Sequence, residues 1–291
     1  MPTFNRAYCI ESCLNALYHA EYPKNHLRLI FVDAYSTDKT YEYLLNFAIQ
    51  HKHEYEQIIT LQQHGNIPTA RNICLNHRGN SEYVVYIDSD IIVNPDFLKR
   101  LIGLAKIGGI VGISYAYKDQ HPLTTSVTER DEVGTGCTLF RADIIEKTGL
   151  FDVNLPFAED TDYCFRAKKL LGCKILQDER IPLLHLGKGR WGSLRGRLER
   201  TFKYRRFYSK YVFKTRRLSM RTIIYSILDF SLMATVLNAW LIIPVVAYFL
   251  VEVFKTKNLL TAIGILANAL IIPFLITLGA IESLFGRMQV G

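Results

Sequence analysis

The stretch from residue 83 to residue 90, Tyr-Val-Val-Tyr-Ile-Asp-Ser-Asp, decides the fold of this 291-residue chain. Residues 83–87 form a continuous apolar run, which is typical of a central strand buried on both faces of a sheet. Asp88 and Asp90 follow directly where that strand ends. A buried strand of this kind predicts helices on both sides of the sheet, and therefore an α/β domain.

Strand-like and helix-like runs alternate around this stretch, which predicts a parallel sheet with crossover helices. We expect further strands over residues 27–32, 57–61 and 109–117, and helices over residues 38–50, 68–76 and 95–106. Ligands of open α/β sheets bind beyond the carboxyl ends of the strands. Asp33 ends the first of these strands, so it should lie at the same edge as Asp88 and Asp90. Two acidic clusters at one edge indicate a divalent cation or basic groups between them.

The net charge of the chain is +8, with 49% hydrophobic residues and a mean hydropathy of +0.08, which excludes a disordered or collagen-like protein. This charge is segregated along the sequence. Residues 1–185 have a net charge of −4, residues 186–221 of +12 and residues 222–291 of 0. The protein is therefore an acidic block, a basic segment and a neutral tail, rather than a generally basic protein.

The neutral tail predicts two transmembrane helices within residues 222–286. No charged residue occurs between Phe230 and Val251 or between Leu259 and Ile281, and each run exceeds the roughly 20 residues that cross a bilayer. The basic segment before the first helix places residues 1–190 on the cytoplasmic side of a cell or endoplasmic-reticulum membrane. No N-terminal signal peptide is visible, and the six cysteines are expected to be free thiols.

Residues 191–221 mix basic residues with Leu, Phe, Tyr and Val at spacings that suit an amphipathic helix. A polybasic aromatic segment can also indicate a nucleic-acid partner. Directly before a transmembrane span, it favours a helix in the lipid headgroup layer with basic side chains on anionic lipids. We therefore expect membrane lipids and no nucleic acid as partners. The segment would serve as an anchor, or would also gather a phosphorylated lipid substrate.

Two acidic motifs can carry chemistry. Asp88 and Asp90 offer hard oxygen ligands on alternate residues, which suits Mg²⁺ or Mn²⁺ bound together with substrate phosphates. Glu159 and Asp160 open an expected helix, where acids also serve simply to complement the helix dipole. In the functional alternative, a carboxylate of this pair accepts a proton from an attacking hydroxyl as a general base.

Six motifs resemble those of the family 2 glycosyltransferases, which have the GT-A fold. They follow the family's order at residues 2–6 (PTFNR), 32–40 (VDAYSTDKT), 65–72 (GNIPTARN), 88–90 (DSD), 134–141 (GTGCTLFR) and 157–166 (FAEDTDYCFR). The resemblance spans about residues 1–190. It implies an inverting transfer from a UDP- or GDP-sugar by a Rossmann-like α/β domain with a mostly parallel sheet.

The resemblance also implies a set of donor-binding residues. Pro2, Thr3 and Asn5 fall in the family's first nucleotide-binding loop. Asp33 matches an aspartate that contacts the base or the ribose. Arg71 matches an arginine that helps to hold the donor.

Metal and catalytic roles follow from the same resemblance. Asp88 would contact the ribose or the metal, and Asp90 would ligate the Mn²⁺ or Mg²⁺ that bridges the diphosphate. His185 matches a histidine that ligates the metal in some members, although a histidine after an apolar run is more often structural. Asp160 matches the catalytic base, and Glu159 matches its supporting acid. The cation would stabilise the leaving diphosphate as a Lewis acid.

Three departures separate this chain from the family pattern. The usual Asp-Asp-Gly-Ser-Thr-Asp reads DAYSTD at residues 33–38, so nucleotide contacts should differ. Members begin with a full strand before the Pro-x-x-Asn loop, whereas this chain starts at Met1; a late start or a missing first strand would weaken the sheet and the donor pocket. Only Arg190 and Trp191 remain of the Gln-x-x-Arg-Trp motif of processive synthases. This incomplete motif argues against processivity. Arg190 and Trp191 would then belong to the acceptor site or to interfacial packing.

The sequence thus predicts a membrane-anchored, inverting, metal-dependent glycosyltransferase. It would move a sugar from a nucleotide-sugar donor to a polyprenyl- or dolichyl-linked acceptor in glycan or glycoprotein assembly. Its parts would be a GT-A domain (1–190), a basic juxtamembrane segment (191–221) and two transmembrane helices (222–286). One alternative is a polyprenyl-phosphate sugar synthase similar to dolichyl-phosphate-mannose synthase, although residues 90–93 lack that group's acidic-glutamine pattern. Another is an inactive membrane scaffold, against which the retained Asp90 and Asp160 argue.

Overall fold

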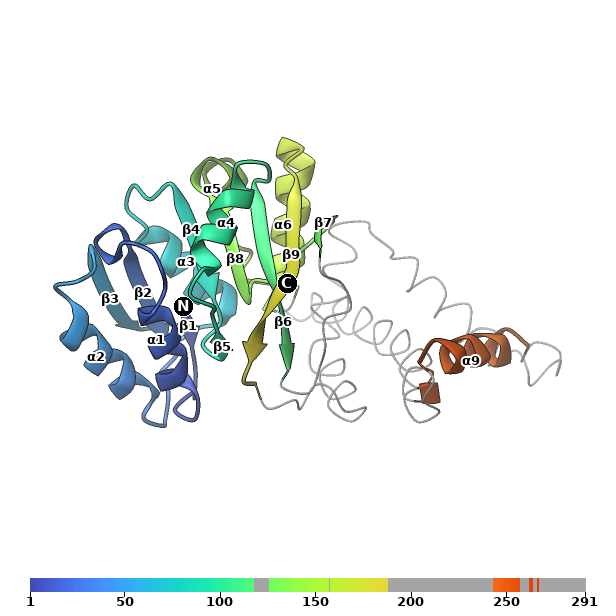
Figure 1. The fold of residues 1–291 in the computed structure, drawn as a ribbon, viewed down its shortest axis with the longest axis horizontal. Coiled ribbons are helices and arrows are strands. Elements are labelled where there is room, and N and C mark those ends of the chain that lie inside the picture. The colour runs from blue at the N-terminus through green and yellow to red at the C-terminus, as the bar shows by residue number, and fades with distance from the viewer. Residues whose placement is uncertain (118–125, 157, 188–242, 257–261, 264–265, 267–291) are drawn as a thin grey trace, which may run out of the picture. The chain divides into compact units, whose positions relative to one another are not determined.

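The structure, a computed structural model, describes residues 1–117, 126–156, 158–187, 243–256, 262, 263 and 266 (Figure 1). The chain divides into two compact units, Met1–Lys188 and Gly189–Gly291. The first unit contains both sheets and most of the described helices. The second unit is described only through a helix and a few further residues.

A three-stranded parallel sheet forms the amino-terminal part of the first unit. Its strands are β1 (Pro2–Thr3), β2 (Arg28–Asp33) and β3 (Gln57–Gln62), in that spatial order. The segments between and after them form α1 (Ile10–Tyr18), the 3-10 turn η1 (Lys24–His26), α2 (Thr40–His51) and α3 (Ile67–Asn76). The short β1 pairs Pro2 with Val32 and Thr3 with Asp33. This register places the loop after β1 beside the loop after β2.

A six-stranded mixed sheet forms the rest of the first unit. Its strands are β4 (Tyr83–Ile87), β5 (Ile91–Ile92), β6 (Ile110–Tyr117), β7 (Val127–Arg130), β8 (Cys137–Arg141) and β9 (Ile175–His185). They lie in the order β4-β8-β6-β9-β5, with β7 paired to β9. Only β6 and β9 are parallel; the other pairings are antiparallel. Its helices are α4 (Phe97–Ala105), α5 (Ala142–Thr148) and α6 (Glu159–Leu171).

Short polar and glycine signals set the ends of the helices that carry site residues. Asn66 caps α3, because its side chain accepts a hydrogen bond from the Thr69 N–H, and Pro68 lies in the first turn. The α6 helix begins after Ala158, which has a left-handed backbone (φ 64°), and it ends at Gly172 with φ 61°. Glycine adopts that conformation without the penalty that other residues meet.

The β9 strand changes its pairing partway along, and this change brings its end to the site. Its register against β6 shifts between Ile113, which pairs with Asp178, and Tyr115, which pairs with Leu183. The extra residues of β9 form a bulge. Arg100 stabilises this bulge, because its side chain donates hydrogen bonds to the Asp178 carboxylate (3.0 Å) and to the Ile181 carbonyl (3.0 Å). Bulges of this kind redirect a strand. Beyond the bulge, the end of β9 pairs with both β6 and β5.

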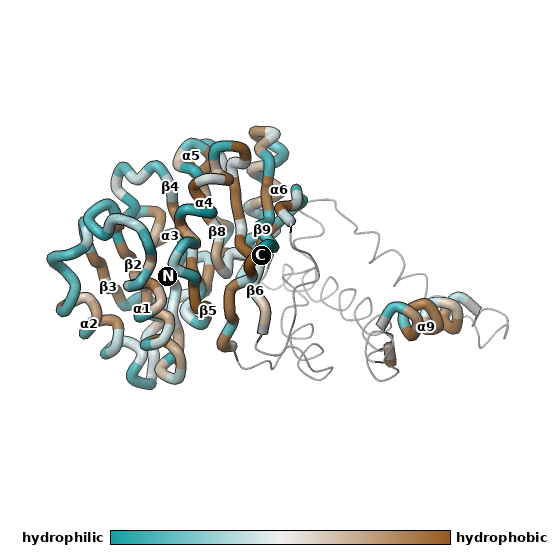
Figure 2. Tube along the Cα trace, in the orientation of Figure 1, coloured by the Kyte–Doolittle hydropathy of each residue, from teal (hydrophilic) through white to brown (hydrophobic). Residues whose placement is uncertain are grey.

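Two clusters of buried hydrophobic residues form the core of the first unit. One lies among the strands and α1, α2 and α4, and the other lies under α3, α5 and α6. Figure 2 shows the hydrophobic residues along the strands and the hydrophilic residues over outer turns and loops. The expected α/β class is therefore confirmed, and each strand and helix predicted within residues 27–117 is present with ends that differ by a few residues.

The second unit is described mainly through α9 (Ile243–Thr256). Within the described residues, no helix combines the length and the hydropathy needed to cross a membrane, and α9 itself has 14 residues. The predicted basic segment, 191–221, lies outside the described residues. So does most of the predicted hairpin, 222–286.

Candidate active site

The Asp88-Ser89-Asp90 loop leaves β4 at the edge where β8 also begins. The Asp88 N–H donates to the Gly136 carbonyl (2.8 Å), which ties this loop to the glycine-rich turn before β8. Although the Asp88 side chain is 41% exposed, desolvation by its surroundings raises the pKa of the carboxyl, and the charge of Arg71 acts in the opposite direction. The negative charge of Asp90 raises the pKa further. The loop is thus an acidic site that favours a positively charged partner.

Arg71 is that partner on one side. It projects from α3, is 3% exposed, and its guanidinium lies 3.8 Å from Asp88 Oδ1 while donating to Glu159 Oε1. The rings of Tyr86 and Phe151 lie 5.8 and 5.7 Å from its central carbon. Desolvation acts to lower the pKa of Arg71, but the surrounding carboxylates raise it overall. Arg71 therefore stays charged and links the loop after β4 to the start of α6.

Glu159 and Asp160 are the first two residues of α6, and they point into different surroundings. Glu159 is 7% exposed and pairs with Arg71. Desolvation raises the pKa of Glu159, and Arg71 opposes that rise. Asp160 is only half-buried; its Oδ1 accepts from the Thr161 N–H (2.8 Å), and its Oδ2 lies 3.7 Å from the position that a Cβ on Gly134 would take. Asp160 is thus the member of the pair that forms no ion pair with an arginine among the residues that the structure describes.

Asp90 lies at the other side of the loop, between Arg6 and His185. The Arg6 Nε is 3.3 Å from Asp90 Oδ2, and the His185 Nε2 is 3.7 Å from Asp90 Oδ1. The backbone supports this approach, because Ile91 pairs with His185 and the Leu186 N–H donates to the Asp90 carbonyl (2.7 Å). The tertiary pairing of β5 with β9 therefore brings together residues that are 95 positions apart in the sequence.

The protonation of His185 decides how it fits a cation. The Gly187 N–H donates to His185 Nδ1 (2.8 Å), so in the neutral ring the proton is on Nε2, the nitrogen that faces Asp90. A nitrogen that carries a proton has no lone pair for a metal. Asp88 and Asp90 are oxygen donors that suit Mn²⁺ or Mg²⁺, whereas His185 in this arrangement does not suit either. Among the residues described, no group of three or more His, Cys, Asp or Glu side chains is arranged to hold a metal ion.

Hydrogen bonds that involve side chains connect the loops after β1 and β2. Asn5 has a left-handed backbone (φ 50°), and its Oδ1 accepts from the Thr37 N–H (2.9 Å). The Asn5 N–H donates to Ser36 Oγ (2.8 Å). Asp33 is fully buried and accepts from the Ser36 N–H (2.9 Å) and the Gln62 amide (3.0 Å). Asp33 thus shapes this pair of loops through bonds within the chain.

Exposed aromatic side chains surround these loops, and the sequence analysis assigned them no role. Tyr35 is 44% exposed, has φ 57°, and stacks on His64 with ring centroids 4.0 Å apart. Phe4 is 51% exposed. A left-handed tyrosine is uncommon and costs energy, so its ring is held outward at this position at the expense of stability. The sequence did contain a signal for this residue, because Tyr35 stands where the family motif has a glycine.

Tyr115 is a second residue that the sequence did not single out. Its ring lies 5.0 Å from that of His185, and its hydroxyl lies 4.0 Å from the position that a Cβ on Gly134 would take, next to Asp160. A Cβ on Gly136 would come within 2.8 Å of the same ring. Glycine at residue 136 therefore allows Tyr115 to pass between the Asp90–His185 pair and the start of α6.

The predicted residues thus gather at one edge of the two sheets. Arg71 links Asp88 to Glu159, and Asp160 is adjacent. Asp90, Arg6 and His185 form a neighbouring group, and the loops that contain Pro2, Thr3, Asn5 and Asp33 lead into Arg6. The two residues predicted for the acceptor side, Arg190 and Trp191, lie outside the described residues.

The fold and this site define an α/β protein whose ligand edge combines carboxylates with buried and half-buried arginines. Residues 1–164, more than half of the chain, match the family model described as glycosyl transferase family 2. The chain belongs to this family.

Relatives differ in what their names say they act on. The chain is 26% identical over 185 residues to poly(ribitol-phosphate) beta-glucosyltransferase of Bacillus spizizenii, which covers 57% of this chain and 28% of that protein. It is 26% identical over 122 residues to dolichyl N-acetyl-alpha-D-glucosaminyl phosphate 3-beta-D-2,3-diacetamido-2,3-dideoxy-beta-D-glucuronosyltransferase of Methanococcus voltae, covering 38% of this chain and 37% of that protein. The chain therefore spans well under two thirds of the length of these relatives.

Among solved structures, the mannosyltransferase PcManGT of Pyrobaculum calidifontis, in complex with GDP-Man and Mn²⁺, has a TM-score of 0.62 to this chain. The sequence identity is 18%, and the alignment covers 98% of this chain and 86% of that one. At this identity the likeness shows the fold, which is the GT-A-like α/β fold expected from the sequence.

Proposed function

We propose that the protein is an inverting glycosyltransferase that uses a nucleotide-sugar donor. The observation that carries this proposal is that the two acids at the start of α6, Glu159 and Asp160, have different surroundings. Arg71 forms an ion pair with Glu159 and lies near Asp88, while the carboxylate of Asp160 stays half-exposed beside the glycine-rich turn. The carboxylate of Asp160 suits removal of a proton from the acceptor. The positive charge of Arg71 beside it suits binding of the anionic donor.

The donor is a UDP- or GDP-sugar that binds along the loops after β1, β2 and β4. The interlaced loops of Asn5 and Asp33 would hold the nucleoside. Two arginines favour the diphosphate, because a guanidinium pairs well with phosphate oxygens. These are Arg71 and Arg6, the second of which lies between Asn5 and the Asp90 carboxylate. Membership of the family supports this assignment, as does the GDP-Man bound to the structural neighbour.

We further propose that Asp88 and Asp90 hold a divalent cation, Mn²⁺ or Mg²⁺. Bound there, the cation would neutralise negative charge on the nucleoside diphosphate as it leaves. Arg6 and His185 now face Asp90. When the cation binds, they would either move away from Asp90 or keep their contact with it from outside the coordination shell of the cation. Oxygen donors on alternate residues support the proposal, and the protonated Nε2 of His185 argues against a histidine ligand.

The chemical step is a single displacement. Asp160 takes the proton of the acceptor hydroxyl, and the acceptor oxygen forms a bond to the anomeric carbon from the face opposite the diphosphate. The bond from that carbon to the diphosphate oxygen breaks, and its electron pair leaves with the nucleoside diphosphate. Asp160 lies in the first turn of α6, where the helix N-terminus stabilises negative charge.

The acceptor is a lipid-linked saccharide on a polyprenyl or dolichyl carrier. Three features support this part of the proposal: the basic segment 191–221, the apolar residues 222–286, and the Methanococcus voltae relative, whose name specifies a dolichyl-linked acceptor. The apolar residues would form two spans that anchor the protein in a cell or endoplasmic-reticulum membrane, with the catalytic residues on the cytoplasmic side. Arg190 and Trp191 would lie between the site and the lipid.

A donor screen in native membranes tests the whole proposal. Membranes that contain the full chain are given isotope-labelled UDP- and GDP-sugars one at a time, and labelled lipids are identified by mass. We expect one donor to label a lipid-linked saccharide, and membranes with Asp160→Asn to leave it unlabelled. Label on the lipid phosphate itself would favour a polyprenyl-phosphate sugar synthase. Failure of every donor would favour the inactive scaffold.

A further inference from the structure

Tyr115 is an exposed aromatic residue of the site to which the proposed reaction gives no role. It lies near the end of β6, and it is 42% exposed. Its ring centroid lies 5.0 Å from that of His185, with an angle of 53° between the ring planes. An exposed aromatic ring offers a ligand a large contact area. Tyr115 is therefore a candidate contact for one of the two substrates.

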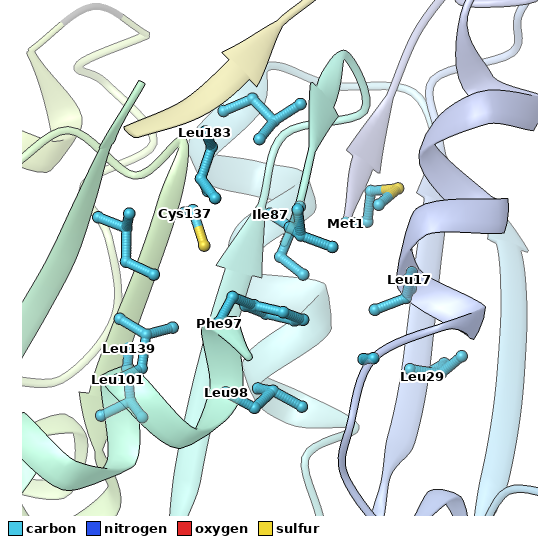
Figure 3. Close-up of a cluster of buried hydrophobic side chains, with 14 of the residues drawn as sticks. Met1, Leu17, Leu29, Ile87, Phe97, Leu98, Leu101, Cys137, Leu139 and Leu183 are labelled. Atoms are coloured by element: carbon cyan, nitrogen blue, oxygen red, sulfur yellow. The ribbon is translucent and has the colours of Figure 1, made fainter. Parts of the chain in front are cut away.

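The backbone at Tyr115 is anchored in the core of the first unit. Tyr115 pairs with Leu183 of β9 directly after the register shift between the two strands. Leu183 is 1% exposed and belongs to the same buried cluster as Cys137 and Leu139 (Figure 3). Irregular pairing of this kind redirects side chains next to active sites. The core therefore sets the direction of the Tyr115 side chain.

The glycine-rich turn before β8 gives the Tyr115 ring its room. A Cβ on Gly136 would lie 2.8 Å from the ring, so a larger residue there would push the ring away. Two hydrogen bonds hold the turn in place. The Gly136 carbonyl accepts from the Asp88 N–H (2.8 Å), and the Gly134 carbonyl accepts from the Thr138 hydroxyl (2.6 Å). The position of the ring is thus tied to that of the acidic loop after β4.

The Tyr115 hydroxyl and the Asp160 carboxylate border one space above Gly134. Tyr115 Oη lies 4.0 Å, and Asp160 Oδ2 lies 3.7 Å, from the position that a Cβ on Gly134 would take. Because glycine has no Cβ, this space has room for a small group of a ligand. A hydroxyl group that enters it can contact both oxygens.

The order of the strands places Tyr115 on the acceptor side of Asp160. The donor is proposed to bind along the loops after β1, β2 and β4, with its diphosphate at the last of these. From β4 the second sheet continues through β8 to β6, so Tyr115 lies beyond the diphosphate as seen from the nucleoside. In a single displacement, the attacking oxygen and the leaving diphosphate lie on opposite sides of the anomeric carbon. The acceptor therefore approaches from the side of β6.

We propose that Tyr115 binds the acceptor and selects a saccharide there, an inference that rests on the proposed glycosyl transfer. Its ring packs against the C–H groups on one face of the acceptor sugar, because the face of an aromatic ring carries partial negative charge. Its hydroxyl donates a hydrogen bond to a sugar hydroxyl beside the one that Asp160 deprotonates. Tyr115 would thus fix both the orientation of the acceptor and the class of molecule that is accepted.

The chemistry around Tyr115 favours a sugar over a lipid phosphate as the acceptor. Tyr115, Gly134 and Gly136 are uncharged, whereas a phosphate group is favoured by an arginine or a lysine. The nearby Arg71 is 3% exposed and is already paired with Glu159. An uncharged hydroxyl therefore suits this part of the site better than an anion.

Saccharide binding tests the proposal without any turnover. The full chain in detergent, with Mn²⁺ and UDP or GDP, is mixed with the methyl glycosides of glucose, galactose, mannose and N-acetylglucosamine. Saturation-transfer NMR measures the contact of the protein with each glycoside. We expect a signal for at least one glycoside in the wild type, weakened about fivefold or more in Tyr115→Ala and less in Tyr115→Phe, which keeps the ring. Leu184→Ala is the matched control and should keep the signal, since Leu184 is 38% exposed on the opposite face of β9.

Transfer kinetics separate an acceptor contact from a donor contact. With the labelled donor and a lipid extract of native membranes, Tyr115→Ala should raise the apparent KM for the extract about fivefold or more. Release of the nucleoside diphosphate to water, measured without the extract, should stay unchanged. The affinity for UDP or GDP, measured by calorimetry, should also stay unchanged. Tyr35→Gly should give the opposite pattern, because Tyr35 lies beside the donor loops.

Three outcomes would overturn the proposal. Saturation transfer could be absent for every glycoside in the wild type, or equally strong in Tyr115→Ala. The affinity for UDP or GDP could fall in Tyr115→Ala, which would place the ring in the donor site. The label could appear on the lipid phosphate itself, which would mean that the acceptor is an anion. Failure of every donor in the screen would count against the proposed function alone, because saturation transfer to a glycoside needs no turnover.

Discussion

At the scale of the residue, Glu159 and Asp160 are adjacent acids whose surroundings separate their roles. Glu159 is buried against Arg71, and its carboxylate is committed to that ion pair. Asp160 is half-buried, and among the described residues its Oδ1 accepts hydrogen bonds from the N–H (2.8 Å) and the hydroxyl (3.5 Å) of Thr161. The resemblance to the family gave the two acids different roles, and the structure adds the physical difference between them, which is made by Arg71 on α3, distant along the chain.

We predict that Asp160→Asn abolishes transfer while donor binding survives. The amide keeps the size of the side chain but cannot accept the hydroxyl proton, so the rate should fall at least about 100-fold. The measurement is product formation together with nucleotide binding by calorimetry. Asp143→Asn is the matched control, since Asp143 is an acid in the first turn of α5. Retained transfer in Asp160→Asn would place the base elsewhere.

Tyr35 allows a prediction in which stability and binding move in opposite directions. Tyr35→Gly relieves a left-handed backbone at φ 57° and should raise Tm. The same change removes an exposed ring stacked on His64 beside the donor loops, so nucleotide affinity should fall about fivefold or more, as for the loss of a base-stacking ring. Thermal unfolding and nucleotide binding are measured on the same samples. A weaker affinity together with a lower Tm would mean that the ring only supports the loop.

At the scale of the element, the bulge in β9 sets where His185 lies. Asp178 is fully buried in the bulge, and it accepts hydrogen bonds from Arg100 (3.0 Å) and from Arg180 (2.9 Å). Desolvation acts to raise the pKa of Asp178, but these arginine bonds outweigh it and lower the pKa from 3.8 to about 2. The bulge is therefore held by a charge that must stay ionised.

This pKa has a defined consequence for stability. Because the folded-state pKa is below the unfolded value, Asp178 contributes its full stabilisation, about 2 kcal/mol, above pH 4, and loses it as the pH falls toward 2. We expect Asp178→Asn to lower the Tm at pH 7 and to flatten the fall in Tm between pH 4 and pH 2. The control is Asp131→Asn, which removes an exposed ion pair with Lys168. Equal acid sensitivity in wild type and Asp178→Asn would contradict the assignment.

The loop after β4 supports a prediction about metal removal. With Asp88 and Asp90 as oxygen ligands, excess chelator should abolish turnover of the sugar nucleotide, and added Mn²⁺ or Mg²⁺ should restore it. Asp90→Asn should prevent that restoration, because an amide is a weaker ligand for a hard cation than a carboxylate. Activity is measured as release of the nucleoside diphosphate. Full activity in excess chelator would eliminate the cation from the proposed function.

At the scale of the whole molecule, the distribution of charge and hydropathy predicts firm membrane attachment. The net charge of +12 over residues 186–221 would by itself give a salt-sensitive association, whereas two apolar spans would not release in salt. We expect the full chain to stay in the membrane pellet in 1 M salt and in alkaline carbonate, and to be released by detergent. Immunoblotting of the fractions measures this. Release by salt alone would limit the attachment to the basic segment.

The alternation of strands and helices could be predicted from the sequence because it depends on local periodicity. The apolar run of β4 and the capping residues of α3 specify their elements within a few residues of the chain. The position of Asp33, Asp88 and Asp90 at strand ends followed from the same local reasoning. These three acids therefore needed no tertiary information to be identified as candidates.

The sequence by itself determined the α/β elements, the acids that follow the strands, and the segregation of charge, since each is a property of neighbouring residues. Only the tertiary structure decided that Arg71 would form an ion pair with Glu159, that Tyr115 would lie against His185, and that Arg6 and His185 would both face Asp90. These depend on pairings between strands far apart in the chain, such as β5 with β9, and on the bulge that shifts their register. Contacts of that range are set by the packing of the whole unit, and no local pattern of residues records them.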